Sequence, residues 1–591
     1  MKCRVADYII SEIYGAGGKN VFMVTGGMIM HLTDAVYQNG KMKFTCCHHE
    51  QAATMAAEAY GRATNKLGVA LVTAGPAALN TLNSVVGAWV DRSPCIIVSG
   101  QSKVSQASVT TPRQFSLQGF NTLPIFEQVT KFAVMLDDIS KVRYEMEKAI
   151  YLATSHPVGP VWVECPIDIQ ATLFDPDDYE GFVPVKDTSS VTEVMSKLDQ
   201  VATVIKNAKR PCILAGAGLR LSGAINSFHE MINKHNIPVV TSRLGMDLIG
   251  YDNPLFIGRP GTYGDRPANF AVQNCDVLIT IGCRMGIGLV GYDYAAFAPK
   301  ATKIVVDVDE KELTKPSVIP DIPVKADAKD FIEILSKELG DFRFSNEEWI
   351  MKARGWKSKY PVNLPEYKEE KEGINSYHFI TNLSEKASAD DTFLLDTGSC
   401  FHVHGQAFKV KYGQRHIVTG GLSTMGYMPG VLGPAVLSGE RGVYCITGDG
   451  SLQMNIQELQ TIMTNNLPVK LVVLNNNGYL LIKLTQQNFC EGRLIGESPD
   501  TGVGFPSLQK LSAAYGLGYM KITSINHLDE KLDDLIAARG PLICEVITPS
   551  QQLLIPRVAS KQLEDGSMMS MPYDDMFPYL DREEYQANQC D

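Results

Sequence analysis

Two turns of this sequence combine residue types that bind a metal ion and a phosphate group. A Gly-Asp-Gly turn places Asp449 after an apolar run, and Asn476 lies 27 positions later in a run of three asparagines. A carboxylate, an amide oxygen and a backbone carbonyl are hard ligands of the kind that Mg²⁺ prefers. The backbone N–H groups of Gly450 and Ser451 open the next expected helix, which favours binding of a diphosphate. The two turns therefore predict a site for Mg²⁺ bridged to a diphosphate.

The elements between these turns explain how residues so far apart in sequence would meet. Apolar residues recur at helical spacing at Ile456, Leu459 and Ile462. Apolar runs typical of strands lie on either side, at 443–447 and 467–474. Both turns then lie at the carboxyl ends of neighbouring parallel strands, where open α/β sheets bind ligands. A Gly-Asp-Gly turn alone is common, so the prediction depends on its spacing from the asparagines. The alternative interpretation is two ordinary turns at the edge of a sheet.

Composition and charge limit the classes of protein to which this chain can belong. Its 591 residues predict roughly three or four domains, and a hydrophobic content of 45% with 20% charged residues is typical of a globular protein. A net charge of −11 argues against a surface that binds nucleic acid or an anionic membrane. No apolar run reaches the ~18 residues of a membrane span. The 13 cysteines are scattered without a Cys-x-x-Cys pair, which predicts reduced thiols in a cytoplasmic protein.

Strand-like runs alternate with helical patterns along most of the chain, which predicts parallel sheets covered by helices. We expect an α/β protein of three consecutive doubly wound parallel-sheet domains, at residues 1–165, 191–340 and 370–550. An Asp- and Pro-rich stretch at 166–190 lacks periodicity and is expected to be a linker. Residues 551–591 are polar with aromatic and Met anchors, and we expect an ordered tail or lid over the active site.

Glu50 is the candidate for acid–base chemistry in the first domain. It lies where an expected strand ends and an expected helix begins, so it is either a first-turn acid that interacts with the helix dipole or a carboxylate with a chemical role. The runs HHEQAATMAAEAYGR, VTAGPAALN and SPCIIVSGQ closely resemble the first domain of thiamine-diphosphate (ThDP) enzymes of the acetolactate synthase type. The spacing of the Gly-Asp-Gly turn and the asparagines resembles the signature of the same enzymes. The resemblance covers most of the chain.

The resemblance implies that ThDP and Mg²⁺ are cofactors of this chain. Glu50 would hold a proton at N1′ of the cofactor, so that the 4′-amino group can become an imine and take the proton from C2. Asp449, the side chain of Asn476 and the carbonyl of Gly478 would be the metal ligands. Met425, in a Gly-Gly-Leu-x-Thr-Met-Gly segment, would wedge between the two cofactor rings and bring the imine next to C2. The alternative for this methionine is core packing.

Further residues match the family at positions that contact the cofactor or the substrate. Gln118 aligns with a glutamine that faces the reacting centre, with a surface amide as the alternative. The other implied cofactor contacts lie in turns of the first and third domains: Gly26, Gly27, Thr73, Asn80, Gly398, Ser399, Ser423, Gly448, Gly450, Ser451, Asn476, Gly478 and Tyr479. Four histidines near these segments are weaker candidates, since surface or core positions are the alternative for each: His48, His49, His402 and His404.

The reaction that the resemblance implies is decarboxylation of a 2-oxo acid, expected to be pyruvate, with ligation of the two-carbon unit to a carbonyl acceptor. A decarboxylase that does not ligate is one alternative, and an inactive ThDP-binding subunit is another. Glu50, Asp449 and Asn476 are all present, which argues against the inactive subunit. In the family the first domain of one subunit faces the third domain of another, so a homodimer or homotetramer is expected.

Two further segments bear on the acceptor and on FAD. The run NNNGYLLIKLTQQNF and the tail DDMFPYLDREEY are similar to a branch of ThDP enzymes associated with surface-polysaccharide and nucleotide-sugar pathways, which implies a keto group on a sugar as acceptor. Acetolactate synthases that hold FAD in the central domain carry Arg-Phe-Asp-Asp-Arg where this sequence has Cys-Arg-Met-Gly-Ile-Gly at 283–288, and the departure disfavours FAD. A GAGLR run suggests a dinucleotide-binding oxidoreductase, but it lacks the G-x-G-x-x-G pattern and downstream acid of that class.

Overall fold

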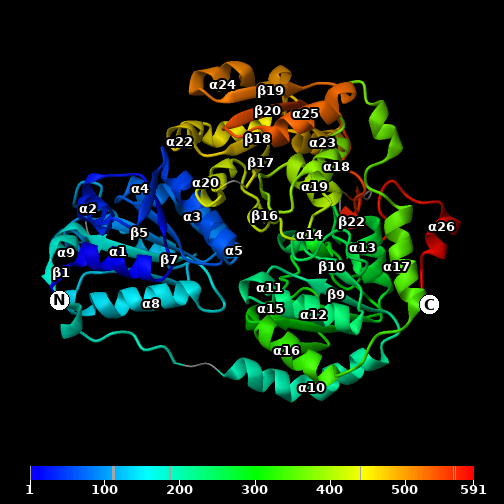
Figure 1. Cartoon of the computed structure of the whole chain (residues 1–591), viewed down its shortest axis with the longest axis horizontal. Coiled ribbons are helices and arrows are strands. Elements are labelled where there is room, and N and C mark those ends of the chain that lie inside the picture. The colour runs from blue at the N-terminus through cyan, green and yellow to red at the C-terminus, as the bar shows by residue number, and fades with distance from the viewer. Residues whose placement is uncertain are drawn as a thin grey trace.

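Three parallel sheets follow one another along the chain in the computed structural model, which describes residues 2–109, 113–185, 188–439, 441–562, 565 and 568–590 (Figure 1). Each sheet has six strands, and helices pack on its faces. The α/β class and the three consecutive doubly wound domains predicted from the sequence are thereby confirmed. Within the described residues, no helix has both the length and the apolar character needed to cross a membrane.

The first and third sheets share one topology, in which the first strand of each six-stranded sheet lies between the second and the third strands of that sheet. The strands of the first sheet, in spatial order, are β3 (Lys43–Cys46), β2 (Asn20–Met23), β4 (Gly68–Val72), β5 (Cys95–Gln101), β7 (Val161–Pro166) and β6 (Phe132–Met135). Those of the third sheet are β16 (Arg415–Val418), β15 (Thr392–Leu395), β17 (Val443–Gly448), β18 (Val469–Asn475), β20 (Leu542–Ile547) and β19 (Gly518–Ile522). The strand order reverses between β2 and β4 and between β15 and β17, and the crevice at such a reversal is where α/β sheets bind ligands.

The central sheet reverses its strand order between β9 and β12. Every residue of these two strands is buried, as expected for parallel strands with helices on both faces. In spatial order the strands are β11 (Phe256–Gly258), β10 (Val239–Thr241), β9 (Pro211–Ala215), β12 (Val277–Ile281), β13 (Thr302–Asp307) and β14 (Ile322–Lys325). The longer helices of this domain are α10 (Ser189–Asn207), α12 (Ile225–His235), α13 (Arg266–Asn274) and α16 (Ala328–Leu339).

One helix joins the first domain to the third domain of the same chain. Helix α3 (Glu50–Thr64) packs against η6 (Met428–Val431) and α20 (Leu432–Ala435), which Figure 1 shows beside it. The backbones approach so closely that a Cβ on Gly433 would lie 2.5 Å from the carbonyl oxygen of Ala56. A single hydrophobic core runs through both domains. The helix that begins at Glu50 is therefore fixed to the third domain of its own chain.

The same interface contains a buried polar cluster around Glu58. Its carboxylate accepts hydrogen bonds from the Ser93 hydroxyl at 2.7 Å and from the Tyr427 hydroxyl, and it pairs with Arg62 at 3.3 Å. Arg62 also donates to the carbonyl oxygen of Val418 at 2.7 Å. A buried carboxylate needs such partners because desolvation disfavours its charge. The cluster fixes α3 against the segment that contains Met425.

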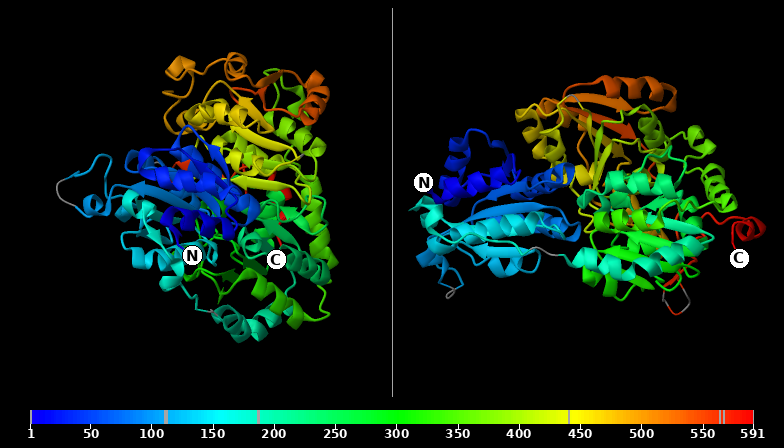
Figure 2. Two further views of the ribbon diagram at one scale, coloured as in Figure 1. Left: turned by 60° about the vertical axis from the view of Figure 1, so that its left-hand side comes forward. Right: turned by 60° about the horizontal axis from the view of Figure 1, so that its bottom comes forward.

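The connection between the first two domains differs from the expected linker. This stretch contains α9 (Ile167–Ala171) and β8 (Leu173–Phe174), and β8 pairs with β1 (Cys3–Arg4) near the N-terminus. Phe174 is buried in the first domain and anchors this pairing. The sequence did not predict this strand, because two residues are too few to show a periodic pattern. Beyond it lies η3 (Pro176–Asp178), and residues 181–185 have no helix or strand. Figure 2 shows the first and central domains that this connection joins.

The C-terminal tail lies against the central domain. The Asn269 amide donates to the carbonyl oxygen of Tyr573 at 2.8 Å, and the Trp356 indole donates to the Asn588 side chain at 2.8 Å. Figure 1 shows this tail beside α13 and α17 (Glu347–Lys359), with α26 (Arg582–Ala587) near its end. The described residues of the tail thus extend the core of the central domain.

Candidate active site

The third sheet presents two helix N-termini side by side at the reversal between β15 and β17. Strand β15 leads through Gly398 into α19 (Ser399–Ala407), and β17 leads through Gly448 into α21 (Asp449–Leu452). A Cβ on Gly398 or on Gly448 would meet nothing within 4 Å, so space is open above both turns. A Cβ on Gly450 would collide with the ring of Tyr479 at 2.1 Å, so only glycine fits there. This open cradle of backbone N–H groups suits a diphosphate.

Asp449 ties the two predicted metal-binding turns together. Its Oδ1 accepts from the backbone N–H of Gly450 at 2.9 Å, and its Oδ2 accepts from that of Gly478 at 3.1 Å. Burial raises the pKa of Asp449 to about 6. Asn476, in the second of these turns, is only 8% exposed, and Gly478 two residues later makes the contact with Asp449. A bound cation would balance the charge of the buried Asp449 carboxylate and could take the side-chain oxygen of Asn476 as a further ligand.

The described residues contain no cluster of three or more His, Cys, Asp or Glu side chains that could bind a metal ion. A metal site here must therefore combine one carboxylate with amide and carbonyl oxygens. Asp449, Asn476 and the carbonyl of Gly478 supply that set of donors, and all three residues are buried. Hard oxygen donors of mixed type suit Mg²⁺, which also keeps water or phosphate ligands.

The segment that contains Met425 is held on both sides in front of α21. The backbone N–H of Gly426 donates to the Ser451 hydroxyl at 2.7 Å, and the Asn455 amide donates to the carbonyl of Gly426 at 2.7 Å. The next backbone N–H, of Tyr427, donates to Asp396 at 2.9 Å. Because the Ser451 hydroxyl is engaged in this way, its backbone N–H remains the group available to a ligand. Sequence reasoning missed Asp396, which directly follows β15, and Asn455, which lies at the end of η7 (Gln453–Asn455).

The first-domain candidates gather at the reversal between β2 and β4. The Glu50 carboxylate, at the first turn of α3, accepts from the Asn80 amide at 2.9 Å through Oε2. A Cβ on Gly26 would lie 2.6 Å from the Thr73 side chain. The Thr73 hydroxyl in turn accepts from the backbone N–H of Met28 at 3.3 Å. The structure therefore brings Glu50, Asn80, Thr73 and the Gly26–Gly27 turn to one edge of one sheet.

Gln118 reaches the same edge from a distant loop. Gly75 has a φ of +64°, and a Cβ there would lie 2.3 Å from the carbonyl oxygen of Gln118. Gln118 itself has a φ of +58°, and its side chain is exposed. Its loop is anchored by the buried Glu164 carboxylate, which accepts from Thr122 and, at 3.2 Å, from Gln101. The exposed Gln118 amide lies on the loop that contacts Gly75, where a substrate group could reach it.

The histidines near these segments have structural roles. The His49 side chain caps α3 by accepting from the backbone N–H of Gln51 at 3.2 Å. His404 is fully buried and lies 3.1 Å from His416, nitrogen to nitrogen. His402 accepts from Arg243 at 2.9 Å, since an arginine can only donate. Burial lowers the pKa of both His402 and His404, so both rings are neutral.

Glu458 is a site residue that sequence reasoning missed. It lies at the start of α22 (Glu458–Thr464) in the third domain and is fully buried. Its carboxylate accepts from the backbone N–H of His48 at 3.0 Å and from the Thr461 hydroxyl at 2.6 Å. Burial raises the pKa of Glu458. The third domain therefore holds the turn that leads into Glu50, across 410 positions of sequence.

Replacing Glu458 by alanine is expected to destabilise the chain by about 1–3 kcal/mol, because it leaves buried donors of His48 and Thr461 without an acceptor. The thermal-unfolding midpoint should fall accordingly. Glu458→Gln keeps one acceptor oxygen and should lose less stability than the alanine variant. An unchanged midpoint in the alanine variant would contradict the role of this contact.

Comparison with known proteins identifies all three domains. Family models of thiamine pyrophosphate (TPP, another name for ThDP) enzymes match residues 3–124 as the N-terminal TPP binding domain, 198–335 as the central domain and 396–546 as the C-terminal TPP binding domain. The acetolactate synthase large subunit of Cyanidium caldarium is 30% identical over 561 residues, which cover 92% of this chain and 92% of its own. The chain belongs to the acetolactate synthase family of ThDP-dependent enzymes. The predicted resemblance and the prediction of an enzyme of the carboligase class are confirmed.

Two further relatives cover nearly the same length. The probable acetolactate synthase large subunit of Methanocaldococcus jannaschii is 30% identical over 93% of this chain and 92% of its own. The acetolactate synthase isozyme 2 large subunit of Escherichia coli is 28% identical over 92% of this chain and 95% of its own. Family membership therefore extends over all three sheets.

Within a single chain of this family member, the two groups of candidate residues do not meet. Among the described residues, no hydrogen bond or ion pair links Glu50, Asn80 or Gln118 to the turns of Asp449 and Asn476. Large apolar side chains near both groups are exposed: Met30, Leu79, Phe115, Leu117, Met454, Ile482 and Phe489. Several large exposed apolar side chains beside each group are a feature of surfaces that bind a partner.

A cavity of about 710 Å³ lies at the carboxyl ends of the central strands and is lined by residues of all three domains. It reaches from Asp307 and Asp309 to Gly420 and Gly421, which precede Met425. Its volume is within the range of cofactor pockets. Arg284, in the run that departs from acetolactate synthase, lines this cavity and donates to the carbonyl oxygen of the first-domain residue Val90 at 3.0 Å.

Proposed function

We propose that this chain catalyses a ThDP- and Mg²⁺-dependent decarboxylation of pyruvate and ligates the two-carbon unit to a carbonyl acceptor. The observation that carries the proposal is the contact of the buried Asp449 carboxylate with the turn of Asn476 and Gly478, beside two helix N-termini. Family membership supplies the cofactor class, and this arrangement is suited to its Mg²⁺-diphosphate end.

Each residue of the proposed site has a distinct task. Asp449, Asn476 and the Gly478 carbonyl bind Mg²⁺. When bound, ThDP would supply the nucleophilic carbon and the electron sink that decarboxylation of a 2-oxo acid requires. Met425 orients the cofactor, and Glu50 holds a proton at Oε1, the oxygen that Asn80 leaves free. The backbone N–H groups that bind the diphosphate belong to the turns at Gly398, Ser399, Gly448, Gly450 and Ser451.

We infer that the complete site forms between two chains, as a homodimer or a pair of dimers. Glu50 and Gln118 of one chain would then face Asp449 and Asn476 of another. The exposed apolar side chains near both groups support this arrangement, because an interface between two chains would remove their apolar area from water. Tyr479 and the diphosphate cradle would then both lie at the interface between the two chains.

The acceptor has two candidates. A second pyruvate would give acetolactate, as the names of the relatives suggest. A keto group on a nucleotide-linked sugar is favoured by the similarity of the segment after Asn477 and of the tail to the surface-polysaccharide branch. Protonation in place of ligation would give a simple decarboxylase. We further propose that FAD is not required, because the run at 283–288 departs from the FAD-binding pattern.

The test is CO₂ release from pyruvate by the purified chain. Release is expected with ThDP and Mg²⁺, is expected to stop after chelation with EDTA and to return with added Mg²⁺, and is expected to be unaffected by FAD. Product analysis separates acetolactate from acetaldehyde. Release that continues without ThDP and Mg²⁺ would overturn the proposal. Absence of release until a keto-sugar is added would identify the sugar as an obligatory acceptor.

A further inference from the structure

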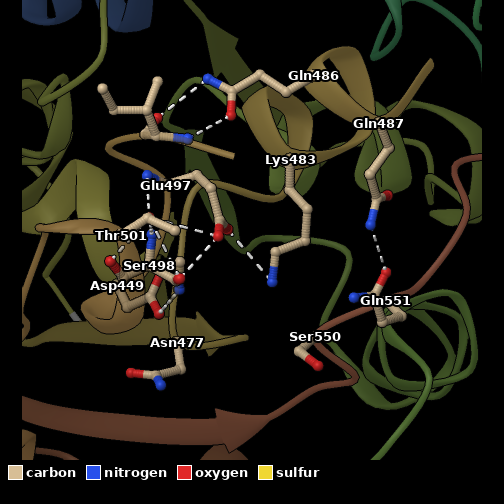
Figure 3. A network of polar contacts seen from close by, with 12 residues as sticks. Asp449, Asn477, Lys483, Gln486, Gln487, Glu497, Ser498, Thr501, Ser550 and Gln551 are labelled. Carbon is tan, nitrogen blue, oxygen red and sulfur yellow. Dashed lines mark hydrogen bonds and ion pairs between the residues drawn. The ribbon is translucent and has the colours of Figure 1, made fainter. Parts of the chain in front are cut away.

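A buried ion pair lies directly beside the predicted metal-binding turn. Helix α23 (Leu480–Phe489) starts two residues after Gly478, and Lys483 extends from its first turn towards Glu497 (Figure 3). The Lys483 Nζ lies 3.3 Å from Glu497 Oε2. The Glu497 side chain is 1% exposed and the Lys483 side chain 10% exposed. Neither the metal ligands nor the diphosphate cradle includes this pair.

The backbone of Glu497 fixes the position of the metal-binding turn. Its carbonyl oxygen accepts from the backbone N–H of Tyr479 at 2.7 Å. A Cβ on Gly478 would lie 2.6 Å from the same oxygen, so the two backbones are in direct contact. Gly478 in turn donates its backbone N–H to Asp449. Any shift of residue 497 therefore displaces the carbonyl and the carboxylate proposed as metal ligands.

The side chain of Glu497 depends on Lys483 for its charge balance. Oε1 accepts from the Ser498 hydroxyl at 2.7 Å. Oε2 has no hydrogen bond, and Lys483 is the cation beside it. A buried carboxylate that loses the counter-charge beside it is strongly disfavoured, so the pair fixes the segment around Glu497 against α23.

A second contact holds the same segment to the same face of α23. The Gln486 amide donates to the carbonyl of Ile495 at 3.0 Å and accepts from its backbone N–H at 2.9 Å. Residues 483 and 486 lie three positions apart and so share one face of the helix. The helix, the segment 495–498 and the metal-binding turn form one connected unit.

We propose that Lys483 and Glu497 are positioning residues for the metal ion, which they never contact. The proposal rests on the Mg²⁺-ThDP function proposed above. The pair holds residue 497, and residue 497 holds Gly478 and Tyr479 at the distance that the metal needs. Residues that orient metal ligands in this indirect way typically contribute about 10- to 100-fold to metal affinity.

The experiment measures Mg²⁺ binding to the full-length chain by isothermal titration calorimetry at saturating ThDP. Glu497→Gln and Lys483→Met are each expected to raise the Kd for Mg²⁺ by about 10- to 100-fold. Lys483→Arg retains the ion pair and is expected to bind Mg²⁺ nearly as the unaltered chain does. Lys470→Met is the matched control, since Lys470 is a buried lysine of β18 at the end of the strand opposite Asn475.

The sign of the Lys483→Met effect separates positioning from simple electrostatics. Loss of a positive charge near a cation site should tighten Mg²⁺ binding by Coulomb attraction alone. A positioning role predicts the opposite, namely that Lys483→Met binds Mg²⁺ more weakly. If a single variant fails to fold, as judged by circular dichroism, the double variant Lys483→Met with Glu497→Leu removes both charges, which buried pairs often tolerate. It should fold and still bind Mg²⁺ weakly.

The outcomes distinguish this proposal from the proposed function. Binding of Mg²⁺ and ThDP by the unaltered chain, with unchanged affinity in Glu497→Gln and in the double variant, would overturn the positioning role alone. Tighter binding by Lys483→Met, or equal weakening by Lys470→Met, would also overturn it. Absence of Mg²⁺-dependent ThDP binding by the unaltered chain would overturn the proposed function and this proposal together.

Discussion

The Glu50→Gln variant is expected to release CO₂ from pyruvate about 10²- to 10⁴-fold more slowly, the range for loss of a positioned acid–base group. Glutamine has the same size and can still accept the hydrogen bond from Asn80. It cannot hold an exchangeable proton at the oxygen that Asn80 leaves free. The expected loss is in kcat, because the proposed metal ligands and diphosphate cradle lie on the third sheet.

The measurement is kcat for CO₂ release together with the Kd for ThDP at saturating Mg²⁺. Glu12→Gln is the matched control, since Glu12 is a half-buried carboxyl on α1 (Val5–Gly15) of the same domain. It should retain full activity. Unchanged kcat in Glu50→Gln, or an equal loss in Glu12→Gln, would exclude Glu50 as the activating acid.

Mixing two inactive variants is expected to restore activity. Glu50→Gln and Asp449→Asn each disable every site of their own homodimer. A dimer of one chain of each kind contains one site with both residues intact and one with neither. Because random pairing of a symmetric dimer makes half of the dimers mixed, co-expression should recover about a quarter of the unaltered activity.

This result distinguishes a site shared between chains from a site within one chain. If Glu50 and Asp449 of the same chain formed the site, the mixture would remain inactive at every ratio. The control is each variant expressed alone and purified in the same way. Activity that rises when differently tagged chains are co-purified, and that is absent from each variant alone, would establish the shared site.

Local sequence pattern predicts the fold and most of the candidate site for one physical reason. Residues at the ends of consecutive parallel strands meet at one edge of a sheet, so Asp449 and Asn476, or Glu50 and Thr73, can be paired from strand boundaries alone. Gly450 also lies at such a strand end, and its lack of a side chain leaves room for Tyr479. The linker at 166–190 was less well predicted, because a two-residue strand carries no periodicity.

The contacts that support the site could not be predicted in this way. Glu458 meets the turn of His48 across two domains, and its place on a helix otherwise indicates a solvated acid. Lys483 and Glu497 are separated by a loop without a repeating pattern. Such pairs depend on how whole elements pack, which periodicity within one element does not encode.

The packing of α3 has a consequence for how activity depends on protein concentration. Within one chain, the separation of Glu50 from Asp449 is fixed by the shared core, by the Glu58 cluster and by Glu458. The separation between Glu50 of one chain and Asp449 of another depends only on association. Dilution should therefore switch the enzyme off while every chain remains folded, and specific activity should return on reconcentration without any refolding step.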